Sequence, residues 1–572
     1  MQVNQPNLSV TFTYKDLLFR KLYNAIICSV ISQILILQLC MVIIKGDPLY
    51  PSSWCTTIFN TVTSFTTWLY VIPHITIIFA QCLICAKDYV LSSNFCSTRF
   101  KKILSVFSLH NLVLLSLHSL VGVLQVWLIL SLTGGDYKGV TKRIDETSSV
   151  LVEETLFLLI GGLWIGMYFF VKVYMSDKHL VFPVIHQKKL TQFKSNVMSL
   201  LKSSFKQAVW PCMYFIMFYY CWGLEIKRNF AYMFNLQIQN SYNSKVYFYH
   251  WLFAALIFFN LNLIKLFFSL FLTEPSEFPL VKPNQNVLTL QESINLDKLP
   301  IVQSLACLDL YFLSLWCPFR RQILFTLSQP GEHPHNWNSL IEAILKLYRS
   351  YIEILDKSTE NLNDKSILQV NSLIHCQNNI PKFRNLRNMS SPYSTPESPK
   401  MLDINRPYQN TTTSENRSEN LLTAFQNKLS NTISILKTIT GINYIFGEIP
   451  QASIQQCLSN GHLIIWSSQG LSELICASLK EDRYGVVQKD LPGVISTLVN
   501  LNQVLDKLNR FPALSRRIVG SDNYNYKMKN AVSSSLKRSL FHICNTFRNY
   551  LSEIPLSKEV SSYLQSTILV KN

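Results

Sequence analysis

The sequence predicts an all-α protein: a six-span polytopic membrane domain followed by a cytosolic helical domain that a disordered insert splits. Charged residues make up 15% of the 572 residues, whereas soluble domains average about 25%, and hydrophobic residues reach 48%. Six long apolar stretches lie before residue 273, and helical periodicity with almost no strand-like alternation follows. This composition excludes a disordered chain, a collagen-like repeat and a small disulfide scaffold.

Each apolar stretch approaches or exceeds the roughly 20 residues that a helix needs to cross a bilayer core. The stretches fall at about 22–44, 58–86, 104–132, 156–171, 208–224 and 250–272. A single apolar run also suits a buried core helix, but six runs bounded by basic loops favour a transmembrane domain over 22–272. The first run is too long for a signal peptide, so we predict a retained helix.

The positive charge is concentrated in the membrane half of the chain. Residues 1–272 carry 22 Lys and Arg against 10 Asp and Glu, which is +12 of the total net charge of +18. The N-terminal tail, 1–21, and the loops 87–103 and 172–206 hold 14 Lys and Arg, against seven in the opposite loops. We therefore predict that both termini face the cytosol, and we expect no direct contact with nucleic acid.

Residues 186–207 have the pattern of a basic amphipathic helix. One arc of the helical wheel holds Leu190, Phe193, Val197, Leu200, Leu201 and Phe205. The other side holds Lys202, Lys206, Gln192 and Ser199. Such a helix can lie in the headgroup plane of an anionic leaflet. Packing against the soluble tail is the alternative that the sequence leaves open.

The soluble part begins with a helical region over 273–356. Helical patterns cover about 301–315 and 340–356, and a capping box formed by Ser339 and Glu342 opens the second pattern.

Residues 357–417 are rich in Asn, Ser, Thr and Pro and have few aromatic residues, so they are predicted to be a disordered insert. Ser391, Thr395 and Ser398 each precede a proline and are candidate phosphorylation sites. Helical periodicity resumes in a C-terminal domain over 418–572.

No catalytic chemistry is evident in the sequence. It contains no phosphate-binding loop, no nucleophile elbow and no dinucleotide fingerprint. His333 and His335 flank a proline in a predicted loop and have no nearby Cys, which favours a structural role over a metal site. We expect no catalytic residue, no metal and no cofactor.

Two stretches of the tail are similar to a known family. The first contains a double arginine, a Pro-Gly turn and a His-Pro-His-Asn-Trp segment: Arg320, Arg321, Ser328, Gln329, Pro330, Gly331, His333, Pro334, His335, Asn336 and Trp337. The second, 481–492, includes Tyr484, Gly485 and Gln488. Together with the layout of six spans and a long tail, they resemble the Ndc-type (nuclear division cycle) transmembrane nucleoporins of the nuclear pore complex.

The first stretch also has a physical interpretation as a corner. Pro330-Gly331 would form a turn, and Asn336 or Ser339 would cap the next helix. Trp337 would hold the corner against a neighbouring helix.

The resemblance implies a non-enzymatic protein of the nuclear envelope that anchors the pore complex in the pore membrane and supports pore assembly. The implied partners are nuclear membrane lipids and other nucleoporins, including an aladin-type propeller protein and the inner-ring nucleoporin that touches membrane. Two alternatives remain from the residues alone: an endomembrane transporter or channel, and a membrane-bound lipid-modifying enzyme. A transporter normally has paired charged groups at mid-membrane, which are sparse here.

Overall fold

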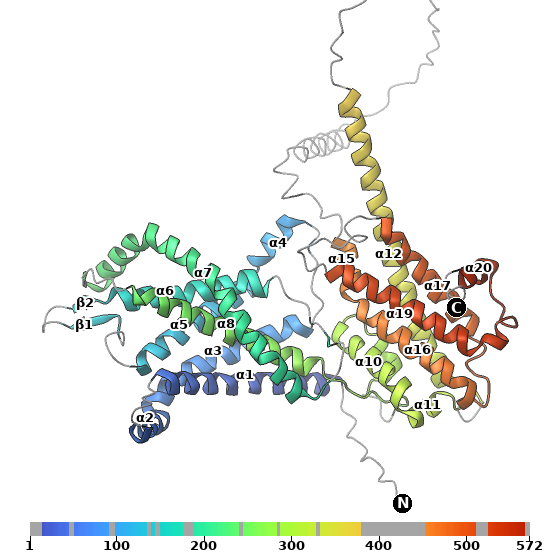
Figure 1. Cartoon of the computed structure of the whole chain (residues 1–572), viewed down its shortest axis with the longest axis horizontal. Helices are drawn as coiled ribbons and strands as arrows, with labels where there is room; N and C mark the ends of the chain where they lie inside the picture. The colour runs from blue at the N-terminus through green and yellow to red at the C-terminus, as the bar shows by residue number, and fades with distance from the viewer. Residues whose placement is uncertain are drawn as a thin grey trace, which may run out of the picture. The chain divides into compact units, whose positions relative to one another are not determined.

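The structure is a computed structural model of the chain, and most of the residues it describes are helical (Figure 1). The described residues are 14–44, 51–90, 96, 98–133, 139–143, 149–175, 180, 182–183, 187–238, 244–282, 287–327, 332–378, 446, 452–510 and 524–566. The chain divides into two compact units, one of Met1–Phe95, Ile103–Leu355 and Ile454–Asn572, the other of Cys96–Lys102 and Asp356–Ser453. The predicted all-α fold class is confirmed.

The N-terminal half consists of long helices that form a bundle. Its helices are α1 (Tyr14–Ile44), α2 (Pro51–Thr63), α3 (Phe65–Val90), α4 (Arg99–Val106), α5 (Leu109–Thr133), α6 (Glu153–Tyr168), the π-helical η1 (Phe169–Tyr174), α7 (Lys189–Phe234) and α8 (Lys245–Leu272). In the described part of the chain, five helices are long and apolar enough to cross a membrane: Lys15–Met41, Phe65–Val90, Leu109–Leu132, Glu153–Tyr174 and Lys245–Leu272. They overlap five of the six predicted stretches.

The remaining predicted stretch, 208–224, lies in the middle of α7. Tyrosines and tryptophans lower its mean hydropathy, which explains why α7 does not count among the five. α7 has 46 residues, so it is about 69 Å long at 1.5 Å per residue, well beyond the roughly 30 Å of a bilayer core. A crossing by this part of α7 stays a prediction.

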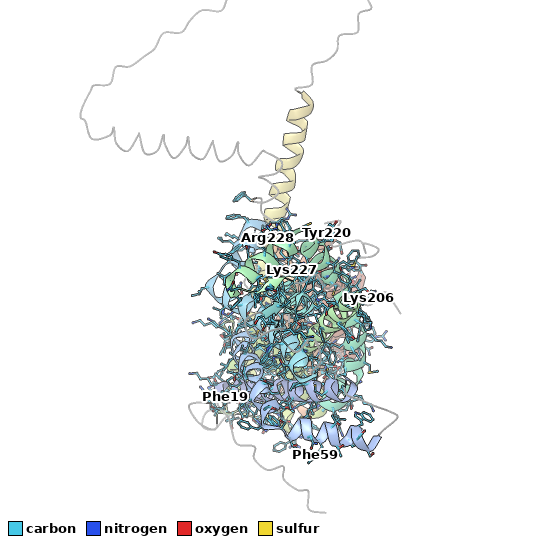
Figure 2. All side chains as sticks on the ribbon, turned by 90° about the vertical axis from the view of Figure 1, so that its left-hand side faces the viewer. Phe19, Phe59, Lys206, Tyr220, Lys227 and Arg228 are labelled. Carbon is cyan, nitrogen blue, oxygen red and sulfur yellow. The ribbon has the colours of Figure 1, made fainter. Side chains whose placement is uncertain are left out.

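Large apolar side chains cover the outside of the helices, as lipid contact requires. Phe19, Phe59 and Tyr220 have exposed fractions of 69%, 67% and 91%, and Figure 2 shows them at the edge of the bundle. In a water-soluble domain such surfaces would be unusual. They are consistent with a bundle whose outer solvent is hydrocarbon.

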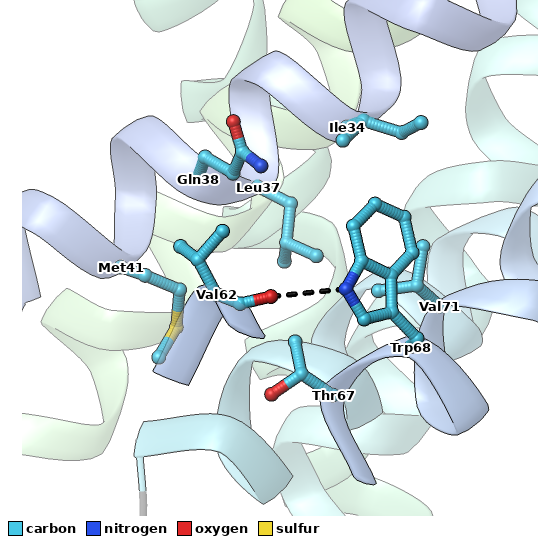
Figure 3. A pocket seen from close by; sticks show the side chains of 8 residues that line it. All are labelled: Ile34, Leu37, Gln38, Met41, Val62, Thr67, Trp68 and Val71. Atoms are coloured by element: carbon cyan, nitrogen blue, oxygen red, sulfur yellow. Dashed lines mark hydrogen bonds between the residues drawn. The ribbon is translucent and has the colours of Figure 1, made fainter. Parts of the chain in front are cut away.

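The second span begins later than the predicted 58–86, because α2 is a separate helix that ends at Thr63. The indole Nε1 of Trp68 donates a hydrogen bond to the carbonyl oxygen of Val62 at 2.9 Å (Figure 3), which closes the junction between α2 and α3. A small cavity of about 20 Å³ lies beside this junction, between α1, α2 and α3. The second span is therefore corrected to Phe65–Val90.

Glycines let α5 and α6 approach each other closely. A Cβ atom on Gly122 would lie 2.2 Å from the carbonyl oxygen of Gly162, and one on Gly166 would lie 2.2 Å from that of His118. Gly162 and Gly166 are four residues apart, the spacing of small residues that brings membrane helices together. Backbone contact therefore sets the distance between these two helices.

We expect Gly166→Ala to destabilise the bundle by about 1–3 kcal/mol, because the added methyl group must push the two backbones apart. Thermal unfolding of the full chain in detergent would show a lower midpoint. Gly493→Ala in α17 (Leu491–Lys507) is the matched control, since nothing lies within 4 Å of the new methyl group. An unchanged midpoint in both variants would contradict the close packing of α5 and α6.

Buried polar side chains link the helices inside the bundle. Asn260 of α8 donates to Gln125 of α5 at 3.1 Å and accepts a hydrogen bond from Gln33 of α1. The Nε2 atoms of Gln81 and His118 lie 3.0 Å apart. Away from water these side chains pair across helices, and such bonds hold membrane helices together.

Three short strands lie at one end of the bundle (Figure 1): β1 (Thr141–Arg143), β2 (Ser149–Leu151) and β3 (Gln237–Ile238). β1 and β2 are antiparallel, and β2 and β3 are parallel, with Val150 opposite Gln237. The sequence did not predict them because strands of two or three residues are too short to show alternation. The pairing brings loops 133–150 and 225–249 together.

The tail forms one helical core from segments on both sides of the insert. Its elements are α9 (Leu290–Ile294), α10 (Pro300–Trp316), α11 (Pro318–Leu324), α12 (His335–Asn378), α15 (Ala452–Ser459), α16 (Gly461–Glu481), α17, the 3₁₀ turns η2 (Leu508–Arg510) and η3 (Arg548–Tyr550), α19 (Tyr524–Thr546) and α20 (Lys558–Leu564). α10 packs against α16, and α16 packs against α19. α10 and α11, bent by 109°, together resemble a broken span in length and composition, but α10 is buried in this core.

The corner before α12 differs from the prediction. α12 begins at His335, and the carbonyl oxygen of Pro334 accepts a hydrogen bond from the amide of Asn338 at 2.9 Å. Ser339 therefore lies inside the helix, where its hydroxyl donates to the carbonyl oxygen of Asn336. The prediction that Asn336 or Ser339 caps the helix is wrong, because the chain turns into the helix earlier, at Pro334.

Candidate functional site

The two family-like stretches of the tail, far apart in the sequence, meet in the structure. Arg321 donates two hydrogen bonds to Glu481, with Nη2 to Oε1 at 2.7 Å and Nε to Oε2 at 3.1 Å. The indole Nε1 of Trp337 donates to Oδ2 of Asp490 at 3.0 Å. We call these two pairs the tail clamp. They join α11 and α12, on one side of the insert, to α16 and the start of α17 on the other.

Trp337 is the buried centre of the tail clamp. Its side chain has no exposed surface, and its ring centroid lies 6.1 Å from that of Phe325. Asn336 donates from its side-chain amide to the carbonyl oxygen of Ile323 at 3.2 Å. The start of α12 is therefore held against the end of α11 and against α17.

Arg320, the first residue of the double arginine, forms a partly buried pair of its own. Its Nη1 and Nη2 atoms each lie 2.8 Å from an oxygen of Asp309. Nη2 also donates to the carbonyl oxygen of Phe278 at 2.7 Å, and the amide of Phe278 donates to Asp309 at 2.9 Å. Arg320 and Asp309 thus tie the segment that leaves α8 to helix α10.

The second family-like stretch forms a tight turn. The carboxylate of Asp482 accepts hydrogen bonds from the amides of Tyr484 at 3.1 Å and Val487 at 3.0 Å. Gly485 has a φ of +66°, in the left-handed region that favours glycine. Tyr484 and Gln488 remain exposed at this turn.

The tail clamp is held by an ion pair and a hydrogen bond, and it contains no arrangement of catalytic side chains. The hydrogen bond to Glu481 raises the pKa of Arg321, so the guanidinium stays charged. His333 and His335 are exposed. No three His, Cys, Asp or Glu side chains gather as metal ligands in the part of the chain that the structure describes.

The predicted amphipathic segment forms the first half of α7. Phe193 stacks on Phe267 of α8 with ring centroids 5.5 Å apart, and Phe205 lies 5.4 Å from Trp251. Leu190 is exposed. The remaining apolar residues of the arc, Val197, Leu200 and Leu201, are half-buried. Lys202 and Lys206 are exposed. Lys206 is labelled in Figure 2. Part of the arc thus packs on α8, and its contact with a membrane surface stays a prediction.

Several predicted residues lie outside the described part of the chain. They are the turn residues Ser328, Gln329, Pro330 and Gly331 and the candidate phosphorylation sites Ser391, Thr395 and Ser398. The predicted insert begins inside α12, whose backbone is helical to Asn378, since residues 357–378 contain neither Pro nor Gly. Residues 379–417 lie outside the described residues.

The fold and the tail clamp define a class: a multi-pass membrane protein with a helical soluble domain. The chain matches the family described as Nucleoporin protein Ndc1-Nup over residues 16–565, and it belongs to that family. It is 27% identical to Nucleoporin Ndc1 of Drosophila pseudoobscura pseudoobscura over 596 residues, which cover 98% of this chain and 99% of the relative. It is 24% identical to Nucleoporin NDC1 of Homo sapiens over 660 residues, covering 97% and 98%.

These comparisons confirm the resemblance that the two tail stretches suggested. The family consists of structural nucleoporins rather than enzymes. The chain is accordingly a transmembrane nucleoporin of the nuclear pore membrane, and its interactions are with that membrane and with other nucleoporins.

Proposed function

We propose that this chain anchors the nuclear pore complex in the pore membrane and supports pore assembly, with the tail binding soluble nucleoporins. The spans hold the chain in the bilayer, and the tail presents a rigid helical surface to the complex. Its proposed partners are an aladin-type propeller protein and the inner-ring nucleoporin that touches membrane.

The connection between the last span and the tail carries this proposal. Glu274, two residues after the end of α8, pairs with Lys189 at 2.7 Å, and its carbonyl oxygen accepts a hydrogen bond from Lys21. Four residues further on, the backbone of Phe278 is bonded to both Arg320 and Asp309. A linker that is held at both ends transmits the position of the spans to the tail, which is what a membrane anchor requires.

We further propose that both termini lie on the cytosolic and pore-facing side. The Lys and Arg excess of the N-terminal tail and of loops 87–103 and 172–206 supports this orientation. The strand pairing between loops 133–150 and 225–249 is consistent with both lying on the opposite side. Protease treatment of sealed nuclear-envelope vesicles with the cytosolic face outward should remove a C-terminal tag. Protection of the tag would reverse the orientation.

Imaging of the full chain, tagged at its C-terminus, beside a pore marker tests the anchoring function. We expect a punctate nuclear rim that coincides with pores, and fewer pores after depletion, restored by the tagged chain. A diffuse reticular or plasma-membrane pattern would contradict anchoring. Normal pore number after depletion would contradict a role in assembly.

A further inference from the structure

A pocket of about 590 Å³ lies between α7, α8 and the loop that precedes α7. This volume falls within the roughly 300–1,000 Å³ of typical ligand pockets. Its walls come from the first half of α7, the last part of α8, Tyr89 of α3 and the loop residues Leu180, Phe182 and Pro183. The ring of Phe182 also packs edge-on against Trp466 of α16, with centroids 5.1 Å apart. The polar side of α7 therefore lines a cavity.

The α7 wall of the pocket is a row of hydrogen-bonding side chains. Three- and four-residue spacing places them on one helix face: Gln192, Asn196, Ser199, Ser203 and Gln207. The side-chain amides of Gln192, Asn196 and Gln207 and the hydroxyl of Ser199 offer N–H and O–H donors to a ligand inside the pocket. The hydroxyl of Ser203 donates to the carbonyl oxygen of Leu200 at 2.9 Å.

α8 supplies the positive charge on the other wall. Lys265 and Ser269 line the pocket beside Asn262, whose amide nitrogen lies 3.5 Å from the hydroxyl of Ser204 and 3.5 Å from the amide oxygen of Gln207. None of the described lining residues is acidic. An ammonium group surrounded by neutral donors suits an anion with several acceptor oxygens, such as a phosphate ester.

The depth of the pocket indicates a lipid as the source of that phosphate. Lys265 lies seven residues before the end of α8, about 10 Å along the helix axis, where a lysine side chain can reach the headgroup region. The rest of the lining is apolar and includes Leu200, Leu266 and Leu270. Such a surface suits the glycerol and the first acyl carbons of a lipid.

We propose that this pocket binds the phosphate headgroup of an anionic glycerophospholipid, with Lys265 paired with the phosphate and the α7 row donating to its oxygens. This site goes beyond the anchoring function and does not depend on any partner of the tail.

Native mass spectrometry of the full chain in detergent tests the proposal, with phosphatidic acid added to a background of phosphatidylcholine. Lys265→Met keeps the length of the side chain and removes its charge, so we expect at least a tenfold loss of retained phosphatidic acid. Lys206→Met is the matched control, because it removes a charge from α7 outside the pocket, and we expect retention within twofold of the wild type. Equal losses in the two variants would indicate general surface attraction and overturn the proposal.

Two further experiments test whether a loss of binding reflects misfolding and whether the phosphate comes from a lipid or from a soluble ester. Asn196→Leu changes no charge and fills the α7 wall, so we expect retention to fall again while the elution volume in gel filtration stays unchanged. Wild-type retention by Asn196→Leu would overturn the proposal. Glycerol 3-phosphate lacks acyl chains and should leave the lipid bound at equal concentration. Displacement at that concentration would assign the pocket to a soluble phosphate ester instead.

Discussion

Replacement of Trp337 by alanine is expected to destabilise the tail by about 3–5 kcal/mol, the cost of removing a large aromatic side chain from a core. The indole is fully buried and donates the hydrogen bond to Asp490 that connects α12 to α17. The variant therefore loses packing and leaves the half-buried carboxylate of Asp490 with one partner fewer. Pulse proteolysis of the full chain across a urea series would measure the loss as a lower midpoint for cleavage of the tail.

Trp316→Ala is the matched control for this experiment. Trp316 ends α10 in the same tail, but its side chain is 74% exposed. We expect the free energy of unfolding obtained from its midpoint to change by less than about 0.5 kcal/mol, as for ordinary surface substitutions. If both variants lost the same stability, the tail clamp would not have Trp337 at its centre.

Asp309→Ala is expected to lower the free energy of unfolding of the tail by about 3–5 kcal/mol. It leaves the partly buried guanidinium of Arg320 without its counter-charge. The Asp309 side chain is 3% exposed, and it also accepts the amide hydrogen bond of Phe278. The segment after α8 should loosen as well. We expect a lower cleavage midpoint and earlier proteolysis at residues 273–282.

An exposed ion pair provides the comparison. Glu225 lies 3.2 Å from Arg228, and both side chains are more than half exposed, so Glu225→Ala should have little effect. The double variant Asp309→Leu with Arg320→Met removes both charges and should regain much of the lost stability. A double variant as unstable as Asp309→Ala would show that packing, and not the unpaired charge, causes the loss.

Features that depend on short stretches of sequence were predictable. The length and hydropathy of the apolar runs located five helices that can cross a membrane, since span length follows from bilayer thickness. Helical periodicity after residue 272 likewise predicted a helical tail, as observed. The conspicuous residues Arg320, Arg321 and Trp337 marked where the tail clamp would be found.

Other features depend on residues that are distant in the sequence, and only the tertiary structure decided them. The pairing of Arg321 with Glu481 spans 160 residues, and no local pattern names that partner among the acidic residues of the tail. The pocket likewise needs α3, α7 and α8 together, and the start of α12 depends on how Pro334 turns the chain. Hydropathy and periodicity are sums over neighbouring residues, so the sequence by itself determined the membrane domain and the helical class. The choice of contacts depends on packing among all the helices at once, which is why the tail clamp and the pocket emerged only from the folded chain.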